Sequence, residues 1–129
     1  MPLVVDTSAW VRQRDPTIIG RWQATVRAGL IAVCPAGVLE LLGAARDEST
    51  HIALDRALGA LPQAPVTASV CNAALGASRD LRGSRRLPAI DYLIAAAAAE
   101  RGFGVLHLDG PYDTLATVLA FPSVRLDTP

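Results

Sequence analysis

Hydrophobic residues occur in two patterns along the chain: short continuous runs, and longer stretches in which they recur at helical spacing. The runs predict short buried strands at residues 3–5, 30–34, 64–66, 105–108 and 123–126. The periodic stretches predict helices near residue 9 and at 15–28, 36–46, 49–60, 67–82, 88–102 and 111–119. Strand and helix alternate without a hairpin signal. We therefore expect an α/β fold of three layers, in which helices flank a mainly parallel sheet of about five strands.

Residues that start or stop helices agree with this division of the chain. Thr7 or Ser8 is suited to cap the first helix, and Pro88 to be the first residue of the helix that contains the alanine run. Gly29 and Gly102 follow predicted helices, where a left-handed residue commonly ends the helix. With 129 residues and no linker or repeat, the chain is expected to form one domain over residues 1–129.

Composition excludes several classes of protein. The formal net charge is zero and 51% of the residues are hydrophobic, which argues against a disordered chain and against a uniformly basic nucleic-acid binder. The two cysteines, Cys34 and Cys71, form no Cys-x-x-Cys pair, and His51 and His107 have no second ligand at zinc spacing. We expect both cysteines to be small buried thiols.

No membrane segment or secretion signal is expected. Asp6 interrupts the first apolar run almost at once, and the alanine-rich stretch at 94–99 is far shorter than the roughly 20 residues that span a bilayer. These features favour a soluble, cytoplasmic protein.

Four acidic residues are expected to meet at one edge of the sheet. Asp6 and Asp109 each follow a predicted strand directly, Asp91 lies in the first turn of a helix, and Glu40 lies about one turn into the helix after the second strand. In a parallel sheet the carboxyl ends of the strands are where functional groups gather. Simpler roles are open for Asp6, as a helix cap, and for Asp91, as a first-turn residue. Glu40 stands between leucines, so we expect it to be buried, and the alternative is a plain surface glutamate.

Carboxylates held close together cannot all stay ionised without a cation. Oxygen ligands without a histidine or thiolate pair favour Mg²⁺ or Mn²⁺. Such an ion can orient a water molecule and stabilise charge on a phosphoryl group, so hydrolysis of a phosphodiester is the reaction that the pattern predicts. Phosphoacceptor receiver domains and dehalogenase-like phosphatases also place aspartates at strand ends, but they rely on a lysine and this chain has none. A Walker-type nucleotide site is likewise excluded, because the chain contains no Gly-x-x-x-x-Gly-Lys segment.

Four segments resemble the PIN-domain family, and within it the VapC-type toxins of bacterial toxin–antitoxin pairs. They are "VVDTSAW", "GVLELL", "RRLPAIDYLIAAAAAERG" and "VLHLDGPYDTLA". The resemblance implies a metal-dependent ribonuclease that forms a homodimer, acts on RNA and is blocked by a cognate antitoxin. It implies a catalytic metal site of Asp6, Glu40, Asp91 and Asp109.

The same resemblance gives Ser8 a supporting role and places Asp113 at the periphery of the site. One position departs from the pattern, because Pro111 stands where such proteins often have another aspartate. This departure keeps an alternative open: a non-catalytic PIN-like scaffold that binds RNA or a partner protein.

Arginines precede the helix that contains Asp91. Arg85 and Arg86 lie in the loop "GSRRL" and are expected to contact RNA phosphates at the rim of the acidic site. Arg79 and Arg82 are equally well explained as the solvated end of the preceding helix.

Overall fold

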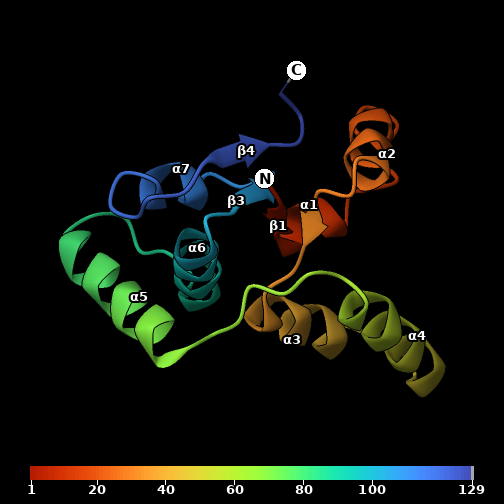
Figure 1. Ribbon diagram of the computed structural model, residues 1–129, viewed down its shortest axis with the longest axis horizontal. Coiled ribbons are helices and arrows are strands. Elements are labelled where there is room, and N and C mark those ends of the chain that lie inside the picture. Colours follow the sequence, from red (N-terminus) through yellow and green to blue (C-terminus); the bar gives the residue numbers. More distant parts are fainter. Residues whose placement is uncertain (129) are drawn as a thin grey trace.

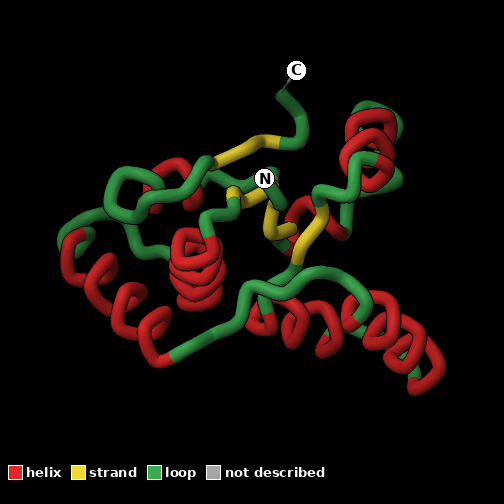
Figure 2. Tube along the Cα trace, viewed as in Figure 1, coloured by secondary structure: helices red, strands yellow, loops and turns green. Residues whose placement is uncertain are grey.

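A parallel sheet of four short strands lies at the centre of the computed structural model, which describes residues 1–128 (Figure 2). The strands are β1 (Leu3–Val5), β2 (Ile31–Ala32), β3 (Gly104–His107) and β4 (Ser123–Arg125), in the order β2-β1-β3-β4. Val4 pairs with Ala32 on one side and with Val105 on the other. All strand residues of β1, β2 and β3 are buried, which explains why their sequences are continuously apolar.

Seven helices surround this sheet within the described chain (Figure 1). They are α1 (Thr7–Trp10), α2 (Ile19–Arg27), α3 (Pro35–Gly43), α4 (Glu48–Gly59), α5 (Ala68–Asp80), α6 (Ala89–Arg101) and α7 (Pro111–Leu115). Strand side chains alternate between two hydrophobic clusters. Val4 and Val105 pack with residues of α5, α6 and α7, whereas Val5 and Leu106 pack with residues of α1, α2, α3 and α4. The three-layer α/β arrangement expected from the sequence is therefore confirmed.

Helix α6 covers one face of the sheet with very small side chains. Ile94 and the four alanines that follow it are all buried. Alanine has the highest helix propensity and lets the helix backbone approach the strands closely. Gly102 ends the helix with a φ of 70°, in the left-handed conformation expected for it.

One of the five predicted strands, the one at 64–66, is wrong. Residues 64–66 form no strand, and this part of the chain contributes only a single parallel bridge between Val33 and Gln63. The Ala64 N–H still donates to the Val33 carbonyl, at 2.8 Å. The next bond of this ladder would need an N–H from residue 35 to the Ala64 carbonyl, but Pro35 has no N–H and is already the first residue of α3, so the pairing ends there.

Smaller differences concern caps and thiols. Asp6, and not Thr7 or Ser8, is the N-cap of α1, because its carboxylate accepts from the Ser8 N–H. Pro88 was predicted to be the first residue of its helix, but it is the N-cap of α6, which begins one residue later at Ala89. Cys34 is buried as expected, but Cys71 is exposed. No helix among the described residues is long and apolar enough to cross a membrane.

Candidate active site

Asp6 occupies the point where β1 ends and α1 begins. Its backbone N–H donates to the Leu106 carbonyl at 2.9 Å, which fixes this position beside β3. The side chain is only 4% exposed, and its Oδ2 accepts from both the N–H of Ser8 (3.1 Å) and the Ser8 hydroxyl (2.6 Å). The Ser8 hydroxyl in turn accepts from the Leu108 N–H at 3.1 Å. Ser8 therefore connects the carboxyl ends of β1 and β3 and orients the Asp6 carboxylate.

Asp91 approaches Asp6 from the first turn of α6. A buried tyrosine lies between them: the Tyr112 hydroxyl is 2.6 Å from Oδ1 of Asp6 and 3.1 Å from Oδ1 of Asp91. The other oxygen of Asp91, Oδ2, is buried and has no hydrogen-bond partner among the described residues. Burial, and then the nearby charge of Asp6, raise the pKa of Asp91 from 3.8 to about 7. A buried acceptor without a hydrogen-bond partner is a site that a cation or a proton can occupy.

Asp109 and Asp113 have different surroundings, although both are exposed. Asp109 follows β3 directly, its N–H donates to Nδ1 of His107 at 3.1 Å, and its charge is one of those that raise the pKa of Asp91. Asp113 is the third residue of α7, as predicted, and its carboxylate accepts from the Ser123 hydroxyl on β4 at 2.7 Å.

Glu40 is not buried, contrary to the expectation from its leucine neighbours. It is exposed on α3, and so is Leu39, with 71% of its surface accessible. The apolar sequence around Glu40 misled because only Leu41 of these neighbours is fully inward. Glu40 accepts a hydrogen bond from the Thr7 hydroxyl, and its charge contributes to the raised pKa of Asp91. It therefore lies near the acidic pair, held by Thr7.

The donor set suits a divalent cation, but the four acids do not converge on one point in this conformation. Among residues 1–128, no three Asp, Glu, His or Cys side chains are placed to hold a metal ion together. Two observations nevertheless fit Mg²⁺ or Mn²⁺: all the donors are carboxylate oxygens, and buried Oδ2 of Asp91 lacks a partner. Asp6 and Asp91 would hold such an ion, with Asp109 and Glu40 beside them.

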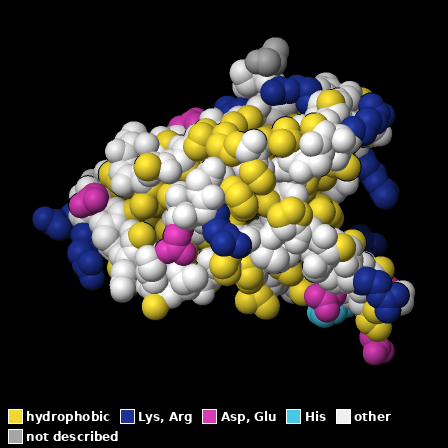
Figure 3. All heavy atoms as spheres, in the orientation of Figure 1, with side chains coloured by type: hydrophobic (Ala, Val, Ile, Leu, Met, Phe, Trp, Pro, Cys, Tyr) yellow, Lys and Arg dark blue, Asp and Glu magenta, His cyan; other side chains and the backbone are white. Residues whose placement is uncertain are grey.

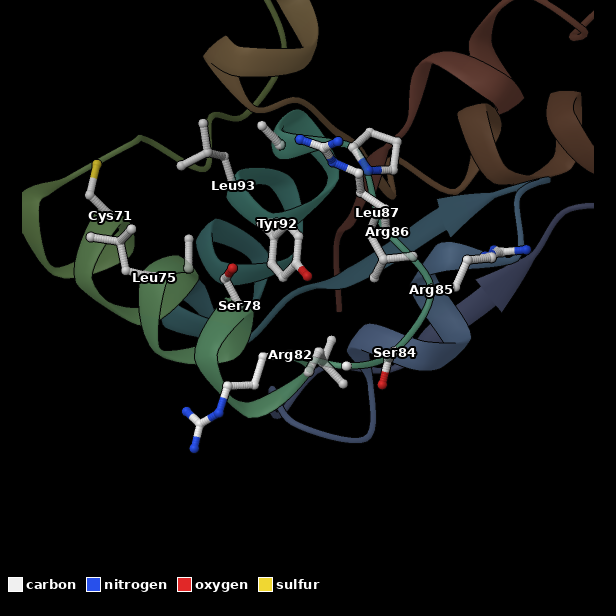
Figure 4. A pocket seen from close by; sticks show the side chains of 15 residues that line it. Cys71, Leu75, Ser78, Arg82, Ser84, Arg85, Arg86, Leu87, Tyr92 and Leu93 are labelled. Atoms are coloured by element: carbon white, nitrogen blue, oxygen red, sulfur yellow. The ribbon is translucent and has the colours of Figure 1, made fainter.

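The loop before α6 lies along a groove of about 990 Å³ between α5 and α6 (Figure 4). Arg82, Arg85 and Arg86 line this groove. Arg85 extends towards the C-terminal strands, whereas Arg82 extends away from them (Figure 4). A Cβ atom on Gly110 would lie 3.8 Å from Nη2 of Arg85, so this guanidinium reaches the turn that follows Asp109. Elsewhere, basic side chains are dispersed over the face shown in Figure 3, without one continuous basic field.

Tyr112 and His107 are the residues that the sequence analysis missed. Both are completely buried, and their rings lie 5.0 Å apart. A signal for Tyr112 was available: it stands at the second position of a helix that starts near the carboxyl end of a buried strand, and a buried tyrosine hydroxyl needs a hydrogen-bond partner.

Comparison with known proteins identifies relatives along nearly the whole chain, although no protein-family model matches the sequence. Ribonuclease VapC18 of Mycobacterium tuberculosis is 34% identical over 128 residues, covering 95% of this chain and 93% of the relative. Ribonuclease VapC51 of the same organism is 36% identical over 124 residues, covering 92% and 88%.

Solved structures show the same fold. A structure of VapBC-5 from Mycobacterium tuberculosis, described as a member of the VapBC family of toxin-antitoxin systems, superposes with a TM-score of 0.70. It covers 96% of this chain and 98% of its own, at 22% identity. Together with the sequence relatives, this likeness shows that the chain belongs to the VapC ribonuclease family, the group of PIN-domain proteins that its motifs resemble.

Proposed function

We propose that this chain is a metal-dependent ribonuclease that hydrolyses RNA phosphodiester bonds and acts as the toxin of a type II toxin–antitoxin pair. The observation that carries the proposal is the buried pair Asp6 and Asp91, in which one carboxylate oxygen has no partner. Family membership supports the activity, because the sequence relatives are named ribonucleases.

The catalytic residues in this proposal are Asp6, Glu40, Asp91 and Asp109, which would hold Mg²⁺ or Mn²⁺. When bound, the cation supplies charge stabilisation at the scissile phosphate and lowers the pKa of a water molecule. Ser8 keeps the Asp6 carboxylate in one orientation through two hydrogen bonds. Asp113 supports the site from outside through its bond to Ser123.

Arg85 and Arg86 would bind the RNA backbone. Both are exposed, both line the groove before α6, and Arg85 reaches the turn beside Asp109. A guanidinium binds phosphate by charge-assisted hydrogen bonds, which hold the backbone without reading its sequence.

The partners in this proposal are an RNA substrate, a cognate antitoxin and a second copy of the chain, in the cytoplasm. The antitoxin is supported by the structural neighbour VapBC-5, which is described as a member of the VapBC family of toxin-antitoxin systems. No membrane attachment is invoked.

A second candidate is a non-catalytic scaffold that binds RNA or a partner protein. Pro111, which is buried at the first position of α7, favours it because a proline cannot supply the extra acid expected there. The spread of the acids over separate points favours it too.

Cleavage of RNA by purified protein distinguishes the two candidates. Protein stripped of metal should leave RNA intact, Mg²⁺ or Mn²⁺ should restore cleavage, and a chelator should abolish it again. Asp91→Asn protein purified in parallel controls for host nuclease. Cleavage by that variant, or cleavage that survives chelation, would contradict the assignment, and RNA binding without cleavage would favour the scaffold.

A further inference from the structure

The Tyr112 hydroxyl lies at the meeting point of three elements of the site. Tyr112 comes from α7, Asp6 follows β1, and Asp91 comes from α6. The tyrosine is completely buried, and its hydroxyl oxygen is within hydrogen-bond distance of one oxygen from each carboxylate, at 2.6 Å and 3.1 Å. No other described side chain contacts both acids by a hydrogen bond.

A hydroxyl has only one hydrogen, so Tyr112 donates to one carboxylate at a time. The hydroxyl can donate over the shorter distance to Asp6 or over the longer distance to Asp91, and it lies between the two carboxylates in either case. Burial and the two adjacent carboxylates raise the pKa of Tyr112 far above its usual range, so the side chain stays a neutral donor. It holds the two acids together without adding charge of its own.

This arrangement accounts for three of the four carboxylate oxygens. Oδ1 of Asp6 and Oδ1 of Asp91 face Tyr112, and Oδ2 of Asp6 accepts from Ser8. Only Oδ2 of Asp91 remains without a partner. Tyr112 therefore determines which oxygen of Asp91 is left open.

We propose that Tyr112 is a positioning residue, whose hydroxyl holds Asp6 and Asp91 side by side and leaves Oδ2 of Asp91 free to bind the divalent cation. This inference rests on the proposed metal dependence. It assigns a role in the metal site to a residue outside the set of acids.

Helix α7 is anchored in a way that keeps Tyr112 in place. Nδ1 of His107 accepts from the Asp109 N–H, so the ring hydrogen is on Nε2, which donates to the Ser123 hydroxyl at 2.7 Å. The Ser123 hydroxyl in turn donates a hydrogen bond to the Asp113 carboxylate, also at 2.7 Å. This chain ties α7 to β3 and β4, while the His107 ring lies against the ring of Tyr112.

Calorimetric titration of metal-free protein with Mn²⁺ tests the proposal. Tyr112→Phe keeps the buried ring and removes only the hydroxyl, and it should weaken Mn²⁺ binding about 10-fold or more, as loss of an outer partner of a metal ligand does. Tyr92→Phe is the matched control. Tyr92 is on α6, directly after Asp91, but it lines the groove and its hydroxyl makes no hydrogen bond to the described residues (Figure 4). Its affinity should equal that of the wild type.

The outcomes separate this inference from the proposed function. If wild-type protein does not bind Mn²⁺, metal dependence itself is wrong. If wild-type protein binds Mn²⁺ and Tyr112→Phe binds it equally well or more tightly, the role of Tyr112 is wrong and metal dependence stands.

A second measurement uses the wild-type protein and does not depend on folding of the variant. Proton NMR of protein with labelled tyrosine should show one hydroxyl hydrogen protected from solvent, assigned to Tyr112, both before and after Mg²⁺ is added. Its disappearance when Mg²⁺ binds would overturn the proposal, because the hydroxyl would then have released the acids.

Discussion

Ser123 on β4 donates its hydroxyl hydrogen to Asp113 on α7, across a distance of 2.7 Å. The same hydroxyl accepts from buried His107, so the Asp113 carboxylate belongs to a network that fastens α7 to the sheet. Asp109, only four residues earlier, is instead among the charges that raise the pKa of Asp91. Asp113 therefore holds α7 to the sheet, whereas Asp109 acts on the acidic pair through its charge.

The first prediction compares these two aspartates. Asp109→Asn should weaken Mn²⁺ binding and reduce cleavage more than Asp113→Asn does, because Asp109 lies at the strand end beside the acidic pair. Asparagine at 113 keeps an oxygen for Ser123, whereas Asp113→Ala removes it and should lower the free energy of unfolding by about 1 kcal/mol. Calorimetry and thermal unfolding measure the two effects. The reverse order of Mn²⁺ affinities would move Asp113 into the metal site.

The second prediction concerns the pH dependence of stability in metal-free protein. Burial and the charge of Asp6 raise the pKa of Asp91 to about 7, above its value of 3.8 in a free chain. The folded state therefore keeps a proton that the unfolded state has lost between these pH values, so ionisation of Asp91 destabilises the fold. Its contribution is full below pH 3.8, falls by at most about 1.4 kcal/mol per pH unit as pH rises, and is lost above pH 7.

Asp91→Asn removes this titration. With a chelator present, the free energy of unfolding of the variant minus that of the wild type should increase as pH rises from 4 to 7, by up to a few kcal/mol. In a separate assay with metal, the variant should not cleave RNA. Denaturant unfolding at several pH values measures the difference between the two proteins, in which other titrating groups such as His107 cancel. A difference that does not change with pH would show that Asp91 is ionised normally in the folded state.

The third prediction concerns the strand that supports the site. A Cβ atom at Gly104 would lie 2.8 Å from Cδ2 of Leu3 and 3.0 Å from the carbonyl oxygen of Pro122, so Gly104→Ala should destabilise the protein by about 1–3 kcal/mol. Gly59 ends α4 with open space around it, and Gly59→Ala should be neutral or stabilising by up to about 1 kcal/mol. Chemical denaturation compares them. Equal effects would mean that β3 adjusts freely.

The fold was predictable because strands β1, β2 and β3 are buried at every residue, whereas the helices expose part of their surface. This difference appears in the sequence as continuous apolar runs against helical periodicity, and it located all four strands. The strand predicted at 64–66 is wrong because a short apolar run precedes a single bridge as readily as it forms a strand. Only the extent of backbone pairing, here one bridge between Val33 and Gln63, distinguishes the two.

The site was predictable where topology alone brings residues together. Asp6 and Asp91 meet because one follows a central strand and the other begins the helix packed on that strand. The exposure of Glu40 was not predictable, since the neighbouring residues in the sequence do not show which side of α3 faces the core. Tyr112 was missed because its role depends on where one hydroxyl oxygen lies between two distant carboxylates.

The last prediction concerns the arginines at the groove. Replacing both Arg85 and Arg86 with alanine should weaken RNA binding and reduce its dependence on salt, by a slope of about one per lost phosphate contact at most. Arg85 should contribute more, because its guanidinium reaches the turn after Asp109. Arg82→Ala is the control: this side chain extends away from the C-terminal strands, so its loss should change the slope less (Figure 4).

These slopes are measured by fluorescence anisotropy of RNA bound to cleavage-deficient Asp91→Asn protein over a range of salt concentrations. Calorimetry should show unchanged Mn²⁺ affinity for the arginine variants of the otherwise wild-type chain. An unchanged slope in the double variant would show that Arg85 and Arg86 are only a solvated surface.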